Sequence, residues 1–240
     1  VIGSRLSGSP QLLAANNWTR DKLEQWGLEN AHLEGFEFGR GWSYQSASID
    51  LIAPRQTSFH GIPVAWTPGT DGSIEAELVY VDAVTASELQ IYQGQLRGKI
   101  VLLSDARDLG VPSNDVFVRR DSSDLRDLVE FEIDSGPSHR RASAAGRDFS
   151  LPRYYFRRAL SAFLLEEGAL AGVMSSSRDG GLINVFGFDH RPGNTFSIPT
   201  MIIEAEQYNM IMRLIDLRQA PRLRINIAAT FHDDDHQNYN

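Results

Sequence analysis

The run Ile100–Leu103 is the feature of the sequence that most constrains its fold. Four consecutive apolar residues, Ile-Val-Leu-Leu, follow the turn residues Gly94–Gly98. A short continuous apolar run bounded by turn residues is typical of a strand buried on both faces. We therefore expect a sheet in the core of this chain.

Further strands and helices are predicted around this run. Alternating or apolar runs between Pro and Gly turns predict strands at Ile49–Ala53, Ile74–Val81, Lys99–Leu103, Ala171–Met174, Leu182–Phe188, Thr200–Ile203 and Leu223–Phe231. Helical patterns occupy Pro152–Glu167 and Glu204–Leu217, and a shorter helix is predicted near Ser123–Glu132. The predicted fold class is α+β, with a mostly β core, a sandwich or a partly open barrel, and helices on its flanks.

The N-terminal part is predicted to be a helix and a strand without a core of their own. Ser9 is a good N-cap, Pro10 suits the first helical position, and Gly27 ends a helix over Pro10–Trp26. Ala31–Phe38 follows as a short strand. A helix and one strand cannot bury an apolar face alone. The helix face is therefore expected to be exposed, repacked, or swapped between copies in a homo-oligomer.

Composition excludes several classes of function. The 240 residues contain 31 acidic and 23 basic side chains, for a formal charge of −8, so we expect no nucleic-acid binding. No apolar run is long enough to span a membrane. Without cysteine there can be no disulfide, thiolate metal site or cysteine nucleophile.

Two short motifs invite catalytic interpretations that the sequence does not favour. His232 and His236 have the spacing of a zinc-binding helix, but Asp233 stands where a metalloprotease carries Glu, and a strand precedes the motif. We expect no metal or cofactor site in this chain. An independent hydrolase built from Asp134, His139 and a serine remains an alternative, although nothing places a nucleophile beside a base.

A candidate surface for a substrate or partner combines aromatic and basic residues. Trp42, Tyr44 and Trp66 either line a shallow aromatic surface or pack inside the molecule, and Arg140 and Arg141 lie in a locally basic segment. An aromatic surface would suit a stand-alone peptide- or carbohydrate-binding module, which is a second alternative.

Several sequence motifs together resemble those of secreted di-zinc exopeptidases, which are aminopeptidases and carboxypeptidases of the M28 type. The opening Ile2–Pro10, the helix end at Trp26–Leu28, and the phrases Phe38–Trp42 and Ala65–Thr70 are similar to the N-terminal part of these enzymes. Gly98–Leu102, Gly168–Val173 and Ile198-Pro199 resemble their protease-associated insert.

The resemblance implies a non-catalytic role. The Gly-x-His-x-Asp motif, which supplies the first zinc ligands in this family, does not occur in the chain. We therefore expect an accessory domain that covers an active-site cleft and shapes the access of peptide substrates. Zinc and catalysis would belong to a peptidase domain of the same parent chain, which would also be the partner of this domain.

The same resemblance predicts the domain organisation and location. Residues 1–45 would belong to the peptidase domain, 46–232 would form the protease-associated domain, and 233–240 would be a frayed polar tail. The polar excursion Asp105–Ser150 is the segment we most expect to contact substrate or the peptidase domain. No signal peptide is visible, but the resemblance implies a secreted or periplasmic protein.

Overall fold

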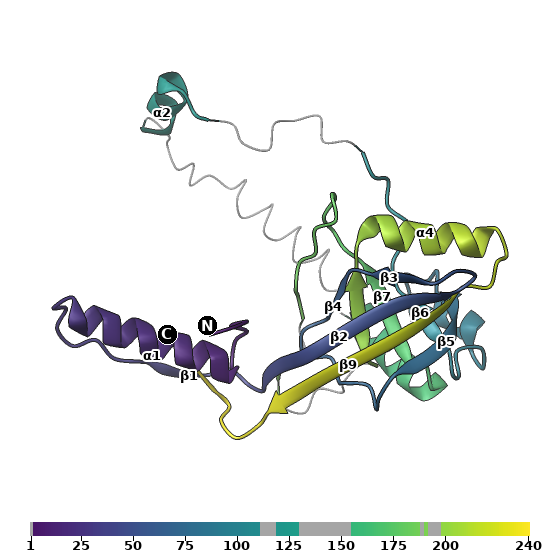
Figure 1. The fold of residues 1–240 in the computed structure, drawn as a ribbon, viewed down its shortest axis with the longest axis horizontal. Coiled ribbons are helices and arrows are strands. Elements are labelled where there is room, and N and C mark those ends of the chain that lie inside the picture. The colour runs from purple at the N-terminus through teal and green to yellow at the C-terminus, as the bar shows by residue number, and fades with distance from the viewer. Residues whose placement is uncertain (1, 111–118, 130–154, 188–189, 192–197) are drawn as a thin grey trace.

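An eight-stranded mixed sheet forms the body of the molecule in the computed structural model, which describes residues 2–110, 119–129, 155–187, 190–191 and 198–240. The strand order is β3-β2-β9-β5-β6-β7-β8-β4. Strand β4, at one end of this order, also lies against β2, so the sheet curls into a nearly closed barrel (Figure 1). In chain order the strands are β2 (Gly41–Ala53), β3 (Thr57–Phe59), β4 (Gly61–Pro63), β5 (Ile74–Tyr80), β6 (Ile100–Leu102), β7 (Ala171–Ser175), β8 (Thr200–Ile203) and β9 (Arg222–His232).

Four neighbouring strands of the sheet, β5 to β8, run parallel. Tyr80 of β5 is level with Leu102 of β6, and Leu102 is level with Val173 of β7. Strands β2, β3, β4 and β9 pair antiparallel with their neighbours. The carboxyl ends of the parallel strands consequently meet at one edge of the sheet.

The two faces of the parallel strands carry different clusters of buried side chains. In β6, Ile100 and Leu102 face a core that also contains Tyr208 and Ile211 of helix α4 (Ala205–Asp216). Val101 points to the opposite face, toward a second cluster with the helical segment 155–167. Strand β6 is fully buried because helices cover both faces, as its unbroken apolar run predicts.

A small arm lies to one side of the barrel, where strands β2 and β9 lead into it (Figure 1). It consists of helix α1 (Pro10–Gln25), strand β1 (Gly35–Glu37) and strand β10 (Gln237–Tyr239), and β1 pairs antiparallel with β10. Ser9 caps α1 by accepting a hydrogen bond from Leu12 N at 3.2 Å. The arm thus joins both ends of the chain.

The predicted fold class is confirmed, with corrections at particular elements. Helices α1, α4 and α2 (Ser122–Val129) match their predictions within one to three residues at each end. The 3-10 helix η1 (Glu88–Tyr92), in the connection from β5 to β6, was not predicted. The strand predicted at Leu182–Phe188 is wrong over the described residues 182–187, which have no regular secondary structure. The Phe186 carbonyl accepts a hydrogen bond from Ala65 N.

The prediction that residues 233–240 fray is also wrong. Strand β10 is tied to β1 by backbone pairing, Tyr239 OH donates to Asp235 at 2.7 Å, and Asn16 of α1 donates to the Tyr239 carbonyl. This polar segment is ordered because backbone pairing and side-chain hydrogen bonds both hold it in place. The division at residues 45 and 232 stays a prediction, and β2 itself runs across residue 45.

Candidate functional site

The parallel strands end at a cavity of about 520 Å³. Val81 and Asp82 after β5, and Leu103 to Asp105 after β6, form one side of it. The helical segment 155–167 forms another side, through residues that include Phe156, Leu160 and Leu164. Ligands of sheets with parallel strands commonly bind at the carboxyl ends of the strands, and this volume lies in the usual range for small-molecule and peptide sites.

The rim of the cavity carries two carboxylates near one tyrosine. Tyr80 OH donates to Asp105 Oδ1 at 2.5 Å. Burial, the hydrogen bond to Asp105 and the charges of Asp105 and Asp82 all raise the pKa of Tyr80, so its hydroxyl stays protonated at neutral pH. Tyr208 OH of α4 donates to the Ser104 carbonyl and accepts from Ser104 N, which fixes the chain that leads to Asp105.

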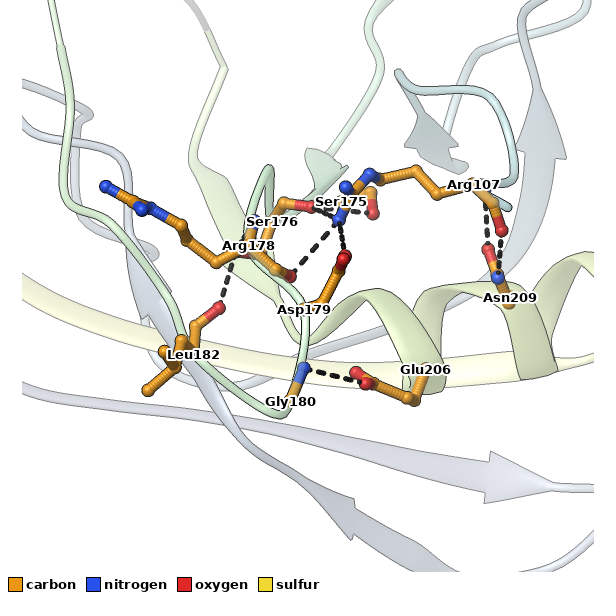
Figure 2. Close-up of polar contacts among 9 residues, drawn as sticks. All are labelled: Arg107, Ser175, Ser176, Arg178, Asp179, Gly180, Leu182, Glu206 and Asn209. Atoms are coloured by element: carbon orange, nitrogen blue, oxygen red, sulfur yellow. Dashed lines mark hydrogen bonds and ion pairs between the residues drawn. The ribbon is translucent and has the colours of Figure 1, made fainter. Parts of the chain in front are cut away.

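A clamp around Arg107 holds the loop that follows β7 (Figure 2). The Arg107 guanidinium donates to the carbonyl oxygens of Ser176 and Arg178, both at 3.1 Å, and pairs with Asp179 Oδ1 at 2.9 Å. Arg107 N donates to Asn209 Oδ1 of α4 at 2.9 Å, and Asn209 Nδ2 donates back to the Arg107 carbonyl at 2.7 Å. The first residues of the Asp105–Ser150 excursion are therefore anchored to both the loop after β7 and α4.

The same loop is also closed from within and from α4. Ser176 Oγ donates to the Leu182 carbonyl at 2.6 Å, and Gly180 N donates to Glu206 Oε1 at 3.2 Å (Figure 2). Ser176, which directly follows β7, thus has a structural role in this loop. Residues Asp134, His139, Arg140 and Arg141 lie outside the described residues, so their predictions stay untested.

The three aromatic residues singled out from the sequence pack together in one cluster. Trp42 is fully buried and Trp66 is 8% exposed, in a cluster that also contains Phe38 and Tyr44. Trp42 Nε1 donates to the Thr67 carbonyl at 2.8 Å. Trp42 and Tyr44 do border a smaller cavity of about 210 Å³ beside residues 2–6. Their role in binding a peptide or carbohydrate stays a prediction.

The His232–His236 motif connects the barrel to the arm. His232 ends β9, where its Nε2 is 2.8 Å from Ser43 Oγ, and His236 Nδ1 is 3.4 Å from the Gly39 carbonyl. Asp233 pairs with Arg40, which also lies over the Phe231 ring. In the described part of the chain, no group of three His, Asp or Glu side chains is close enough to hold a metal ion.

The arm exposes large apolar side chains. Trp26 is 71% exposed, Trp18 55%, Leu28 51% and Phe36 45%. Within α1 Ala15 is buried, whereas Trp26 at the C-cap of the helix is exposed, so part of the apolar face of this helix is exposed, which is one of the outcomes expected from the sequence. None of the described helices is long and apolar enough to cross a membrane.

Solved structures of peptidases share this architecture. A peptidase M28 precursor from Shewanella amazonensis superposes with a TM-score of 0.59 at 17% identity, over 100% of this chain and 46% of that one. A zinc aminopeptidase from Bacillus subtilis gives a TM-score of 0.51 at 12% identity, over 99% of this chain and 42% of that one. The chain has the fold of a part of M28 peptidases. The likeness covers the arm as well as the barrel of this M28-like fold.

Curated sequences agree with this M28-like fold. Carboxypeptidase Q of Mus musculus is 34% identical over 103 residues, which is 42% of this chain and 21% of that protein. The protein of the same name from Rattus norvegicus is 34% identical over 106 residues. No protein-family model matches the chain. The resemblance expected from the sequence is therefore confirmed, and the matched stretch spans about a fifth of the curated relatives.

Proposed function

We propose that this chain is a non-catalytic, protease-associated-like part of a secreted or periplasmic zinc exopeptidase. It would cover the active-site cleft of a peptidase domain in the same parent chain and influence which peptides enter. In this proposal, zinc and its ligands belong to that peptidase domain. Peptide substrates would meet this domain on their way to the cleft.

The observation that carries this proposal is the unburied arm. A helix on a two-stranded sheet is too small to be stable by itself, yet Trp18, Trp26 and Phe36 remain exposed on it. An apolar patch of this kind is typical of a surface that another protein or domain covers. The M28 peptidase from Shewanella amazonensis, which shares the fold, is more than twice as long as this chain.

The anchored start of the Asp105–Ser150 excursion supports the same role. Arg107 fixes residues 105–107 to the loop after β7 and to α4, so the excursion starts from a defined point on the barrel. A rigid scaffold that presents a long insertion is typical of loops that contact substrates or other domains.

Aminopeptidase and carboxypeptidase assays with added zinc test this proposal. The 240-residue chain should be inactive, and a protein extended to include the proposed peptidase domain should be active. Shortening Asp105–Ser150 in the extended protein should change the preference among peptide lengths more than the turnover of a small amide substrate. Turnover by the 240-residue chain alone, or an extended protein without a peptidase, would refute the proposal.

A further inference from the structure

The cavity at the carboxyl ends of β5 and β6 has a chemical character that the covering role does not require. Most of its lining is apolar, and it includes Val81, Leu103, Leu160, Leu164 and Phe186. Leu164 is 1% exposed, whereas Val84 at the rim is 73% exposed, so the cavity runs from the core to solvent. An apolar pocket with a few polar groups at its mouth is the usual form of a ligand site.

The polar groups at the mouth favour a positively charged partner. Asp82 and Asp105 follow two hydrogen-bonded parallel strands whose ends are level, which brings both residues to one edge of the sheet. Asp105 accepts a hydrogen bond from Tyr80, and the charges of both carboxylates act on that hydroxyl. Among the described residues, the Asp82 carboxylate has no hydrogen-bonding or ionic partner. An ammonium group would give this carboxylate an ionic partner.

We propose that this cavity binds the amino-terminal residue of a peptide, with an apolar side chain inside and the ammonium group at Asp82 and Asp105. Arg157 also lines the cavity and already interacts within the protein. Its positive charge makes the lining electrostatically uneven, and so orients the ammonium group toward the β5–β6 side. The ligand follows from the combination of an apolar interior and an acidic rim.

This binding is separate from the proposed covering role. The cavity is built from residues of the described barrel and of the segment 155–167, so it needs no peptidase domain. A failure to bind would leave the covering role untouched, and binding would occur even if the parent protein were not a peptidase.

Calorimetric titration of the full 240-residue chain with Leu-Gly-Gly tests the proposal. N-acetyl-Leu-Gly-Gly lacks the ammonium group, Gly-Gly-Gly lacks the apolar side chain, and free leucine has both but carries its carboxylate beside the ammonium group. We expect Leu-Gly-Gly to bind about tenfold or more tightly than each of the three. Equal binding of the acetylated peptide, tighter or equal binding of free leucine, or no binding of Leu-Gly-Gly would overturn the proposal.

Two matched variants locate the site. Asp82→Asn keeps the shape of an exposed side chain and removes its charge, so the chain should fold as before and bind Leu-Gly-Gly about tenfold more weakly. Asp71→Asn makes the same change in an exposed turn away from the cavity and should leave binding unchanged. Amide NMR shifts should move at residues 81–84 and 103–105 of the unmodified chain. Unchanged affinity in Asp82→Asn, or shifts confined elsewhere, would refute the assignment.

Discussion

Arg107 Nη1 lies 2.9 Å from Asp179 Oδ1 and, from the same nitrogen, also reaches the backbone carbonyls of Ser176 and Arg178. The side chain of Arg107 thus joins the segment after β6 to the loop after β7, and its backbone N and carbonyl bind Asn209 of helix α4 (Figure 2). Each contact of the side chain involves the charged guanidinium, and a hydrogen bond to a charged group contributes more than one between neutral groups.

Replacement of Arg107 by alanine should therefore loosen the loop 176–182 and lower the free energy of unfolding by about 1–3 kcal/mol. Hydrogen exchange should accelerate at the amides of Arg178 and Gly180, which are held in this loop. Arg178→Ala is the matched control, because the structure gives its side chain no partner among the described residues, and it should change stability by less than about 0.5 kcal/mol. Equal losses of stability in the two variants would show that the Arg107 side chain does not hold this loop.

The N-cap of α1 makes a separate prediction about the arm. Ser9 is buried, and its hydroxyl accepts from Leu12 N, which also donates to the Ser9 carbonyl, so Ser9→Ala removes one of the two acceptors of that amide and should destabilise α1 by about 1 kcal/mol. Faster hydrogen exchange at Leu12 and Leu13, with little change in β6, would reveal the effect. Ser4→Ala, at an exposed position before the helix, should leave this exchange unchanged. Uniform acceleration across the barrel would mean that Ser9 acts on the fold as a whole.

Trp42 tests whether the aromatic cluster is a core. The side chain is fully buried, and its Nε1 hydrogen-bonds the Thr67 carbonyl at 2.8 Å. Trp42→Ala should cost about 3–5 kcal/mol of unfolding free energy, measured by denaturant titration. Trp18→Ala removes the same side chain from a site that is 55% exposed, and it should cost well under 1 kcal/mol. A mild effect at Trp42 would favour a surface role instead.

The sequence predicts those parts of the fold in which local pattern and burial agree. Strand β8 is predicted to the residue, and β6 within one residue at each end, because their apolar runs are short and bounded. Strand β2 is eight residues longer than its prediction, since Gly41–Ser48 mixes polar and apolar residues while its backbone pairs along β9. The length of this pairing depends on tertiary contacts with β9, and local periodicity in the sequence does not predict it.

The candidate site was missed from sequence for a related reason. Asp82 and Asp105 are 23 positions apart, and only the parallel pairing of β5 with β6 brings them together. The usable signal is that a polar residue follows each of two predicted strands, since carboxyl ends of parallel strands converge. The sequence does not show whether the two strands run parallel, so the signal is ambiguous without the topology.

The ion pair between Arg40 and Asp233 makes the junction of arm and barrel sensitive to acid. The hydrogen bond from Arg40 lowers the pKa of Asp233 below its ordinary value. A carboxylate whose pKa is depressed on folding stabilises the native state fully above its unfolded pKa, near 3.9, and loses that contribution as the pH falls through its folded pKa. The protection of the β10 amides against hydrogen exchange, relative to their intrinsic exchange rates, should therefore fall below about pH 4.

Asp233→Asn should show faster exchange of β10 already at neutral pH, and its difference from the unmodified chain should shrink as the pH falls below about 4. Asp234→Asn is the control, because its exposed carboxylate has no partner among the described residues, and it should follow the unmodified chain at every pH. A difference that is already lost well above about pH 4 would mean that another group at this junction, and not Asp233, holds the arm against acid.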